Sequence, residues 1–139
     1  EKSLNIKDRT QKYLGEGWTS MPLAKEKNIR LVNHLTFTTG ISDQAKNLFD
    51  FSPKNLSYKS DACQQWAYHP ATFSVLEQVI QKGTGREQEA YFKEKIGDQI
   101  GMKGFWQKAG QTQSFYSDAR SFGRFGLLML AKGNWAGKQ

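Results

Sequence analysis

The amino-acid sequence predicts a mainly α-helical domain, and two observations carry this prediction. Several segments hold apolar residues at the three- and four-residue spacing of an amphipathic helix. Residue types that begin or end helices, such as Pro, Asp and Gly, stand at the boundaries of these segments. The 139 residues are enough for one domain with a core, so we expect a single domain over residues 1–139. Four Trp, five Tyr and nine Phe predict a core rich in aromatic rings.

Two helices are expected in the first part of the chain. One covers residues 28–37, where Asn28 is a suitable N-cap and apolar residues share one face. The other covers residues 70–83 and has the clearest boundaries. Pro70 suits its first turn, and Gly83 suits the left-handed position that ends a helix.

Two more helices are expected further along the chain. The third covers residues 87–99, and Gly101 stops it. The fourth opens at Ser117 or Asp118, either of which can cap a helix, and its apolar stripe ends at Gly133.

Two stretches, residues 43–60 and 103–116, show weak periodicity and are rich in polar or aromatic residues. We expect both to be long surface connections, because loops of this length run over the surface. Ordered loops of this kind often border functional sites.

Charge and composition narrow the classes of function. The formal net charge is +7, but Lys and Arg are interleaved with Asp and Glu, which predicts a solvated basic surface and no nucleic-acid partner. A basic domain that binds nucleic acid or an envelope polymer is a weaker alternative that rests on charge alone. Cys63 is the only cysteine, so no intrachain disulfide forms. His34 and His69 lack metal-ligand spacing, and we expect His34 to be structural and the protein to use no metal or other cofactor. No apolar run is long enough for a transmembrane helix, and the opening residues do not have the pattern of a signal peptide.

No serine of this chain is followed three residues later by lysine, the spacing that would place a nucleophile and its base on one helix face. Ser117 and Ser121 have arginine at that position instead. Arginine does not serve as a base, because it keeps its proton at all ordinary pH values. The usual Ser–Lys pair is therefore absent from these 139 residues.

Five motifs in order resemble the class C β-lactamase, esterase and DD-peptidase group of serine hydrolases, in the β-lactamase and penicillin-binding superfamily. They are SLNIKDRTQKYL, IRLVNHLTFTTGI, WAYHPATFSVLEQVIQKGTG, IGMKGFW and SDARSFGRFGLLMLAKGNWAGK. The second resembles the family's I-T-x-x-x-L-L-x-H-T-S-G-L, with Phe37 where His is common and Thr39 where Ser is common. The resemblance implies an interior fragment: the helical region of an α/β transpeptidase-like fold, with most of the sheet absent from this chain.

The resemblance also implies a site. Tyr68 matches the tyrosine of the family's Y-x-N motif, which works with the S-x-x-K lysine to move the proton of the nucleophilic serine. The alternative is that Tyr68 only packs beside Trp66 at the start of the helix. Pro70 stands where the motif has Asn, and proline offers neither a side-chain amide nor a backbone donor. His69 is a candidate to supply a substitute donor to substrate. Trp106 ends the matching IGMKGFW segment and is a further candidate for substrate contact.

The function that follows is acyl transfer by the parent protein on an ester, β-lactam or peptide bond, with Tyr68 in the base role and the serine and lysine outside this chain. A small-molecule or cell-wall-type substrate, the remaining segments of the parent fold, and a periplasmic or secreted location are what the resemblance implies. We expect the chain alone to be inactive. The alternative is a non-catalytic ligand-binding domain on the same fold, for which Pro70 is the first sign.

Overall fold

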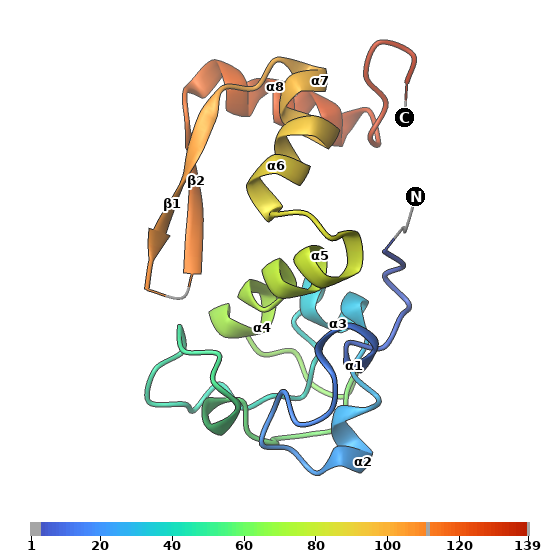
Figure 1. Ribbon diagram of the computed structural model, residues 1–139, viewed down its shortest axis with the longest axis vertical. Coiled ribbons are helices and arrows are strands. Elements are labelled where there is room, and N and C mark those ends of the chain that lie inside the picture. Colours follow the sequence, from blue (N-terminus) through green and yellow to red (C-terminus); the bar gives the residue numbers. More distant parts are fainter. Residues whose placement is uncertain (1–3, 111, 139) are drawn as a thin grey trace. The chain divides into compact units, whose positions relative to one another are not determined.

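The computed structural model describes residues 4–110 and 112–138 and has a mixed α/β architecture (Figure 1). Helices make up 41% and strands 13%, and the strands form a two-stranded antiparallel sheet. This finding corrects the expected fold class, a mainly α chain that forms the helical region of a transpeptidase-like fold. The difference arises in residues 103–116, which were expected to be a surface connection and instead contain the two strands.

The chain divides into two compact units. The first comprises residues 1–86 and 110–112, and the second comprises residues 87–109 and 113–139. Each unit is described by itself below.

The first unit is built from short helices joined by long loops. Its helical elements are α1 (Gln11–Leu14), α2 (Leu23–Glu26), α3 (Leu31–Leu35), the 3-10 turn η1 (Pro53–Asn55), α4 (Pro70–Ser74) and α5 (Leu76–Thr84). Two isolated β-bridges, Arg9 with Arg30 and Ile41 with Tyr58, tie its loops together. Residues 43–60 form the long connection that the sequence predicts, apart from the single turn η1.

Helix α3 is shorter than the predicted helix over residues 28–37, and Asn28 is not its cap. Arg30 occupies the N-cap position in an extended conformation. The Asn33 side-chain oxygen accepts a hydrogen bond from the backbone N–H of Arg30 at 2.8 Å, which satisfies an N–H at the start of the helix. The cap is therefore made by Asn33, a residue inside the helix. The residue type at Asn28 did not predict where the helix begins.

The helix expected over residues 70–83 begins at Pro70 as predicted but is divided at Val75 into α4 and α5. Gly85, and not Gly83, takes the left-handed position that ends α5, with φ of 74°. Gly83 has a packing role instead. A Cβ atom at this position would lie 2.4 Å from Leu4 Cδ2 and 3.0 Å from Tyr13 Cε1, so glycine allows α1 to approach α5.

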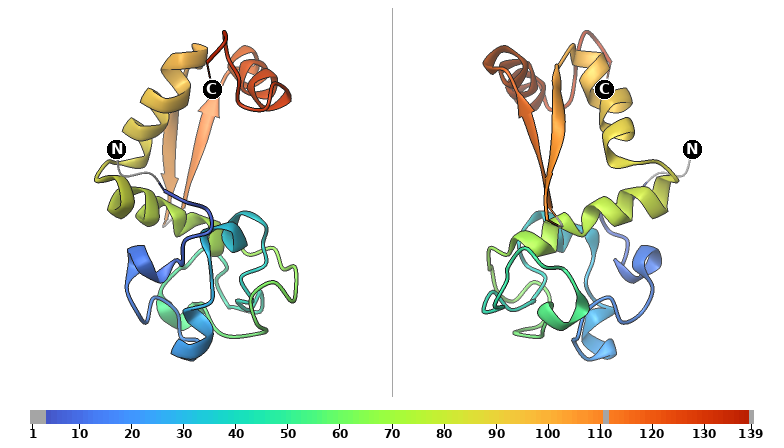
Figure 2. Two further views of the ribbon diagram at one scale, coloured as in Figure 1. Left: turned by 90° about the vertical axis from the view of Figure 1, so that its right-hand side faces the viewer. Right: turned by 60° about the vertical axis from the view of Figure 1, so that its left-hand side comes forward.

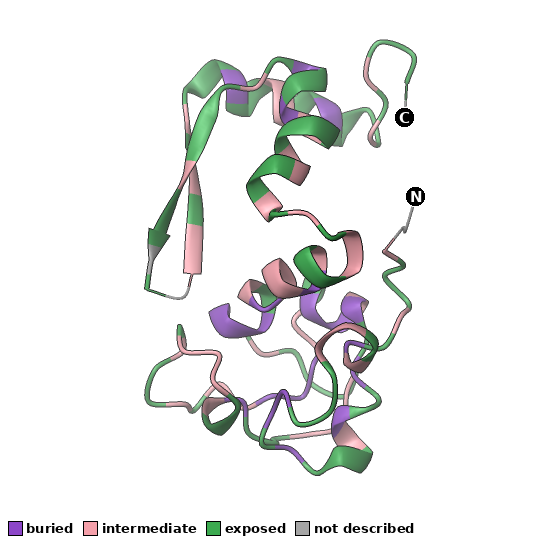
Figure 3. Ribbon diagram, viewed as in Figure 1, coloured by how far each residue is buried: buried purple, intermediate pink, exposed green. Residues whose placement is uncertain are grey.

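The hydrophobic core of the first unit lies beneath the start of α4. Figure 3 shows that buried positions concentrate in α3, α4 and the loops of this unit. The core side chains are Trp18, Met21, Ile29, Ile41, Leu56, Ala71 and Val75. Because α4 contributes Ala71 and the break contributes Val75, the helix that follows Tyr68 is anchored in the core.

His34 is a buried structural histidine that joins α3 to α4. Its Nδ1 donates to the backbone carbonyl of Thr72, since a carbonyl can only accept. Its Nε2 is therefore the acceptor, and the Thr10 hydroxyl donates to it at 2.9 Å. Burial lowers the pKa of His34 to about 4, so the ring is neutral at pH 7.

The second unit contains a hairpin with helices on both sides (Figure 2). Its elements are α6 (Gln88–Phe92), the π-helical turn η2 (Lys93–Gly97), α7 (Asp98–Ile100), β1 (Gly104–Ala109), β2 (Thr112–Ser117) and α8 (Ala119–Leu130). Elements α6, η2 and α7 form one continuous helical run in place of the α-helix expected over residues 87–99. No helix of the described part of the chain is long and apolar enough to cross a membrane.

Two of the helix boundaries expected in the second unit are confirmed. Gly101 follows α7 in the left-handed conformation with φ of 65°. Asp118 caps α8, and its carboxylate accepts a hydrogen bond from the Ser121 backbone N–H at 2.7 Å. This bond and the neighbouring backbone hydrogen bonds lower the pKa of Asp118. Helix α8 ends at Leu130, three residues before Gly133.

Candidate functional site

Tyr68 lies on the surface of the first unit, two residues before α4. Its side chain is 53% exposed, and Trp66 and Phe73 beside it are 65% and 39% exposed. The Tyr68 ring centroid lies 5.1 Å from that of Phe37 and 6.4 Å from that of Phe73. Phe37 also contacts Trp66 at 6.1 Å and Phe73 at 6.0 Å. We call these four residues the Tyr68 aromatic cluster.

The backbone at Phe37 and at Ala67 holds the cluster in place. Phe37 follows α3 with φ of 55°, a left-handed conformation that is uncommon for a bulky residue. Its carbonyl accepts a hydrogen bond from the Ala67 backbone N–H at 2.9 Å, which joins the end of α3 to the residue before Tyr68. Strained backbone of this kind is concentrated at functional sites, because the surrounding contacts have to hold it.

The phenol of Tyr68 is exposed to solvent. Among the described residues, none forms a hydrogen bond with its hydroxyl, and no lysine ammonium lies over its ring. A phenol accepts a proton near neutral pH only when a cation stabilises the phenolate. A base role for Tyr68 therefore stays a prediction, and it requires a cation from outside the described residues.

His69 turns inward at the start of α4. It is extended, with φ of −144° and ψ of 106°, as expected for a residue before proline. Its carbonyl accepts hydrogen bonds from the Thr72 backbone N–H at 3.0 Å and the Thr72 hydroxyl at 2.7 Å. The ring is fully buried, and neither ring nitrogen has a hydrogen-bond partner. Burial lowers the pKa of His69, and the negative charge of Asp43 opposes this effect.

Pro70 is the first residue of α4 and is buried. Its ring fixes the helix start without offering a donor at the surface. The structure thus brings Tyr68, His69 and Pro70 together at one helix start, with Tyr68 exposed and the other two buried. Contact of His69 or Pro70 with a substrate stays a prediction.

Trp106 lies in the second unit, on β1, where it lines a cavity of about 320 Å³. Its indole ring contacts Phe92 of α6 and Phe115 of β2, with centroid distances of 5.6 and 5.2 Å. The indole Nε1 is buried and has no hydrogen-bond partner. A substrate role for Trp106 is a prediction that concerns this cavity.

The serines that were considered as nucleophiles have structural roles. The Ser121 hydroxyl is buried and accepts a hydrogen bond from the Lys103 backbone N–H at 3.0 Å. The Ser117 hydroxyl donates to the Lys103 carbonyl. Both hydrogen bonds therefore join the start of α8 to Lys103, which lies between α7 and β1. Within residues 4–110 and 112–138, no three His, Cys, Asp or Glu side chains are grouped as a metal site.

Of the Tyr68 aromatic cluster, only packing of Tyr68 beside Trp66 was considered from the sequence, as the alternative to a catalytic role. Trp66 stands two residues before Tyr68, and Phe73 stands five after it, on the exposed side of α4. Phe37 was noted only as a departure from the family motif. A count of large apolar residues around a candidate catalytic residue could have suggested the first two, but the approach of Phe37 requires the tertiary fold.

Comparison with known proteins does not assign this chain. No protein-family model matches it, and no curated protein sequence matches it.

Proposed function

We propose that this chain is part of a serine hydrolase related to the class C β-lactamases, esterases and DD-peptidases. It acts by acyl transfer on an ester, β-lactam or peptide bond. Tyr68 serves as the base that relays the proton of the nucleophile. The serine and lysine of the S-x-x-K pair come from sequence beyond these 139 residues, since the chain itself lacks that pair.

The observation that carries this proposal is the placement of Tyr68. Its phenol is half exposed at a helix start that is anchored in the core through Ala71 and Val75. A base must be held rigidly and still reach the reacting group, and this position meets both requirements. The rings of Trp66 and Phe73 beside it offer an apolar surface for the acyl or leaving group of a substrate.

The resemblance extends the proposal to substrate and location. We infer a small-molecule or cell-wall-type substrate and action in the periplasm or outside the cell. The remaining segments of the parent protein are the partners that complete the site.

A second function, ligand binding without catalysis, is favoured by one observation. Pro70 stands where the family motif has Asn, and it is buried at the first position of α4. Neither its side chain nor its backbone can donate a hydrogen bond to a substrate. A protein that had lost this donor could keep the aromatic surface as a binding site.

Labelling of the complete protein separates the two functions. The polypeptide encoded by the complete reading frame is treated with a fluorophosphonate probe and with a fluorescent penicillin, and the 139-residue chain serves as the control. Covalent labelling of the complete protein alone, at a serine of an S-x-x-K motif, supports acyl transfer. Absence of that motif, or of labelling with both probes, refutes it in favour of ligand binding.

A further inference from the structure

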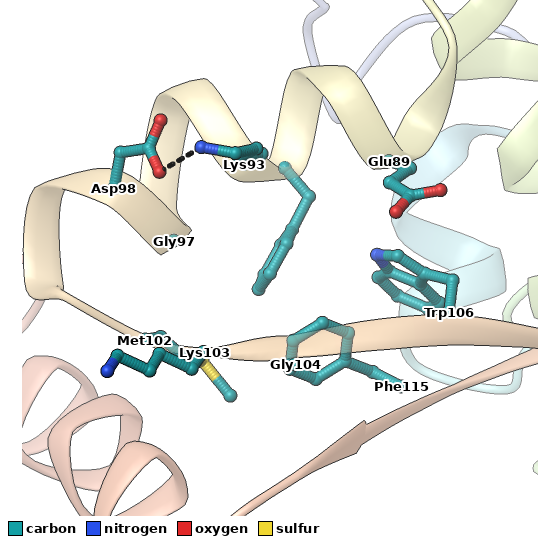
Figure 4. Close-up of a pocket in the computed structure, with 10 residues that line it drawn as sticks. Glu89, Lys93, Gly97, Asp98, Met102, Lys103, Gly104, Trp106 and Phe115 are labelled. Atoms are coloured by element: carbon teal, nitrogen blue, oxygen red, sulfur yellow. Dashed lines mark hydrogen bonds and ion pairs between the residues drawn. The ribbon is translucent and has the colours of Figure 1, made fainter.

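The second unit holds a cavity with aromatic walls between the α6–η2 helix and the hairpin (Figure 4). Phe92, Trp106 and Phe115 form these walls, and Phe92 and Phe115 lie 5.0 Å apart. The volume of about 320 Å³ falls at the small end of the range for ligand sites. A single-ring molecule suits this size, and the aromatic walls favour an aromatic ring.

One hydrogen-bond donor in the wall is left without a partner. The indole Nε1 of Trp106 is buried and forms no hydrogen bond. A buried donor without a partner is destabilising relative to a hydrogen-bonded one, so this position favours an acceptor. Figure 4 shows the indole nitrogen on the side of the ring that faces helix α6, toward the carboxylate of Glu89, with no hydrogen bond between them.

Among the charged side chains that line the cavity, Glu89 is the carboxylate without an ion pair, and Lys103 adds a second ammonium beside that of Lys93. Lys93 and Asp98 form an ion pair with each other (Figure 4), so their charges compensate. Glu89 lines the same cavity and takes part in no ion pair or hydrogen bond among the described residues. The cavity thus presents an indole donor and a carboxylate acceptor that are not joined to each other.

The helix that forms one wall is locally irregular. The π-helical turn η2 interrupts the helical run and contributes Lys93 and Gly97 to the cavity lining. Turns of this type occur frequently at functional sites. Gly97 is buried, and a Cβ atom there would lie 3.7 Å from the Phe92 ring, which is an ordinary contact distance. Glycine therefore leaves space in this part of the cavity, although a larger residue would not clash.

We propose that this cavity binds a small hydroxylated aromatic molecule of the phenol class. A hydroxyl group both accepts and donates, so its oxygen accepts from the Trp106 indole and its proton is donated to Glu89. The ring packs against Phe92 and Phe115. An ammonium group would leave the indole without an acceptor, whereas a hydroxyl serves both the indole and Glu89. The proposal is independent of acyl transfer at Tyr68.

The test compares p-cresol with toluene, which has the same ring and methyl group but no hydroxyl. The whole 139-residue chain is labelled with ¹⁵N, and the indole N–H signals are followed by NMR during each titration. Trp106→Phe identifies the signal of Trp106. We expect p-cresol to shift this signal saturably at millimolar concentration and to bind at least about tenfold more tightly than toluene, the equivalent of one good hydrogen bond.

A pair of variants assigns the acceptor. Glu89→Ala is expected to weaken p-cresol binding about tenfold and to leave toluene binding unchanged. Glu94→Ala, an exposed position in the same helical run, is the control and leaves both unchanged. The indole signals of the other tryptophans report whether each variant keeps its fold.

Three results overturn the proposal. One is a Trp106 signal that p-cresol does not shift. Another is equal binding of toluene and p-cresol to the unaltered chain, a comparison that needs no variant. The third is p-cresol binding that Glu89→Ala leaves unchanged, since Glu89 would then not be the acceptor of the hydroxyl.

Discussion

The ring of Phe37 lies 5.1 Å from the ring of Tyr68, and the backbone of Phe37 is held in the left-handed region with φ of 55°. A residue that follows α3 thus packs against the candidate base that precedes α4. The Ala67 hydrogen bond to the Phe37 carbonyl, at 2.9 Å, fixes the same contact through the backbone. Correct placement of Tyr68 therefore depends on a strained conformation at Phe37.

The strain at Phe37 predicts an inverted order of stability for two variants. Phe37→Ala and Phe37→Gly both remove the ring contacts with Tyr68 and Trp66. At most ordered positions alanine is more stabilising than glycine, but only glycine adopts positive φ without a steric cost. We expect Phe37→Gly to be more stable than Phe37→Ala by about 1 kcal/mol in urea unfolding. Equal stability, or a more stable alanine variant, would show that Phe37 is not strained.

Gly40 and Gly85 form a matched pair for close packing. Both have positive φ, of 78° and 74°. A Cβ atom at Gly40 would lie 2.1 Å from the Ser60 carbonyl oxygen, whereas nothing lies within 4 Å of one at Gly85. We expect Gly85→Ala to cost about 1 kcal/mol of unfolding free energy, from backbone strain alone. Gly40→Ala should cost at least about 3 kcal/mol or prevent folding, because the backbone of Ser60 has to move. Similar losses in thermal unfolding of the two variants would argue against this packing.

His34 makes stability depend on pH in a defined direction. Burial lowers the pKa of His34 from its ordinary value of 6.5 to about 4. Between these values the unfolded chain binds a proton at His34 and the folded chain does not, so acid favours unfolding. The free energy of unfolding is therefore unaffected by His34 titration above pH 6.5. It decreases as the pH falls toward 4, by an amount on the order of 3 kcal/mol.

His34→Asn tests this contribution. The Asn amide can keep the donor to the Thr72 carbonyl but cannot titrate, and it loses the Thr10 contact. The variant should be less stable than the unaltered chain at pH 7, with a shallower decline in unfolding free energy between pH 6.5 and 4. Parallel pH profiles in urea unfolding would mean that His34 titrates normally in the folded chain.

Local signals predicted the ends of several elements correctly. Pro70 begins α4, Asp118 caps α8 and Gly101 ends α7, because each role is decided by the residue's own backbone or side-chain chemistry. Gly83 was assigned the wrong role because two glycines stand near the end of α5. The packing of Tyr13 and Leu4 against Gly83 decides between them, and this packing is tertiary.

The hairpin was missed although the sequence holds a signal for it. Strands β1 and β2 are two runs, each with two adjacent aromatic residues, that flank Gly110. Alternation places Trp106 and Phe115 on the face toward Phe92, while Phe105 and Tyr116 stack on the other face with centroids 5.6 Å apart. Both faces carry aromatic rings, so the apolar and polar alternation that marks a half-buried strand is absent.

The position of Tyr68 was predicted only through the family resemblance, and its surroundings were not predicted. The burial of His69 depends on how α4 enters the core, which residue type cannot show. The contact between Phe37 and Tyr68 joins positions far apart in the sequence. Long-range packing of this kind has no periodic signature in a single sequence.

The most direct test of the account is the turnover of a p-nitrophenyl ester by the complete protein and its Tyr68→Phe variant. Loss of the phenol hydroxyl should lower kcat by about 10²- to 10⁴-fold with little change in KM, because the base acts in the transition state. Tyr58→Phe is the control, since the Tyr58 hydroxyl binds Asp61 at 2.9 Å and has no part in the Tyr68 aromatic cluster. A Tyr68→Phe variant that keeps the kcat of the unaltered protein, or a complete protein without turnover, would contradict the role assigned to Tyr68.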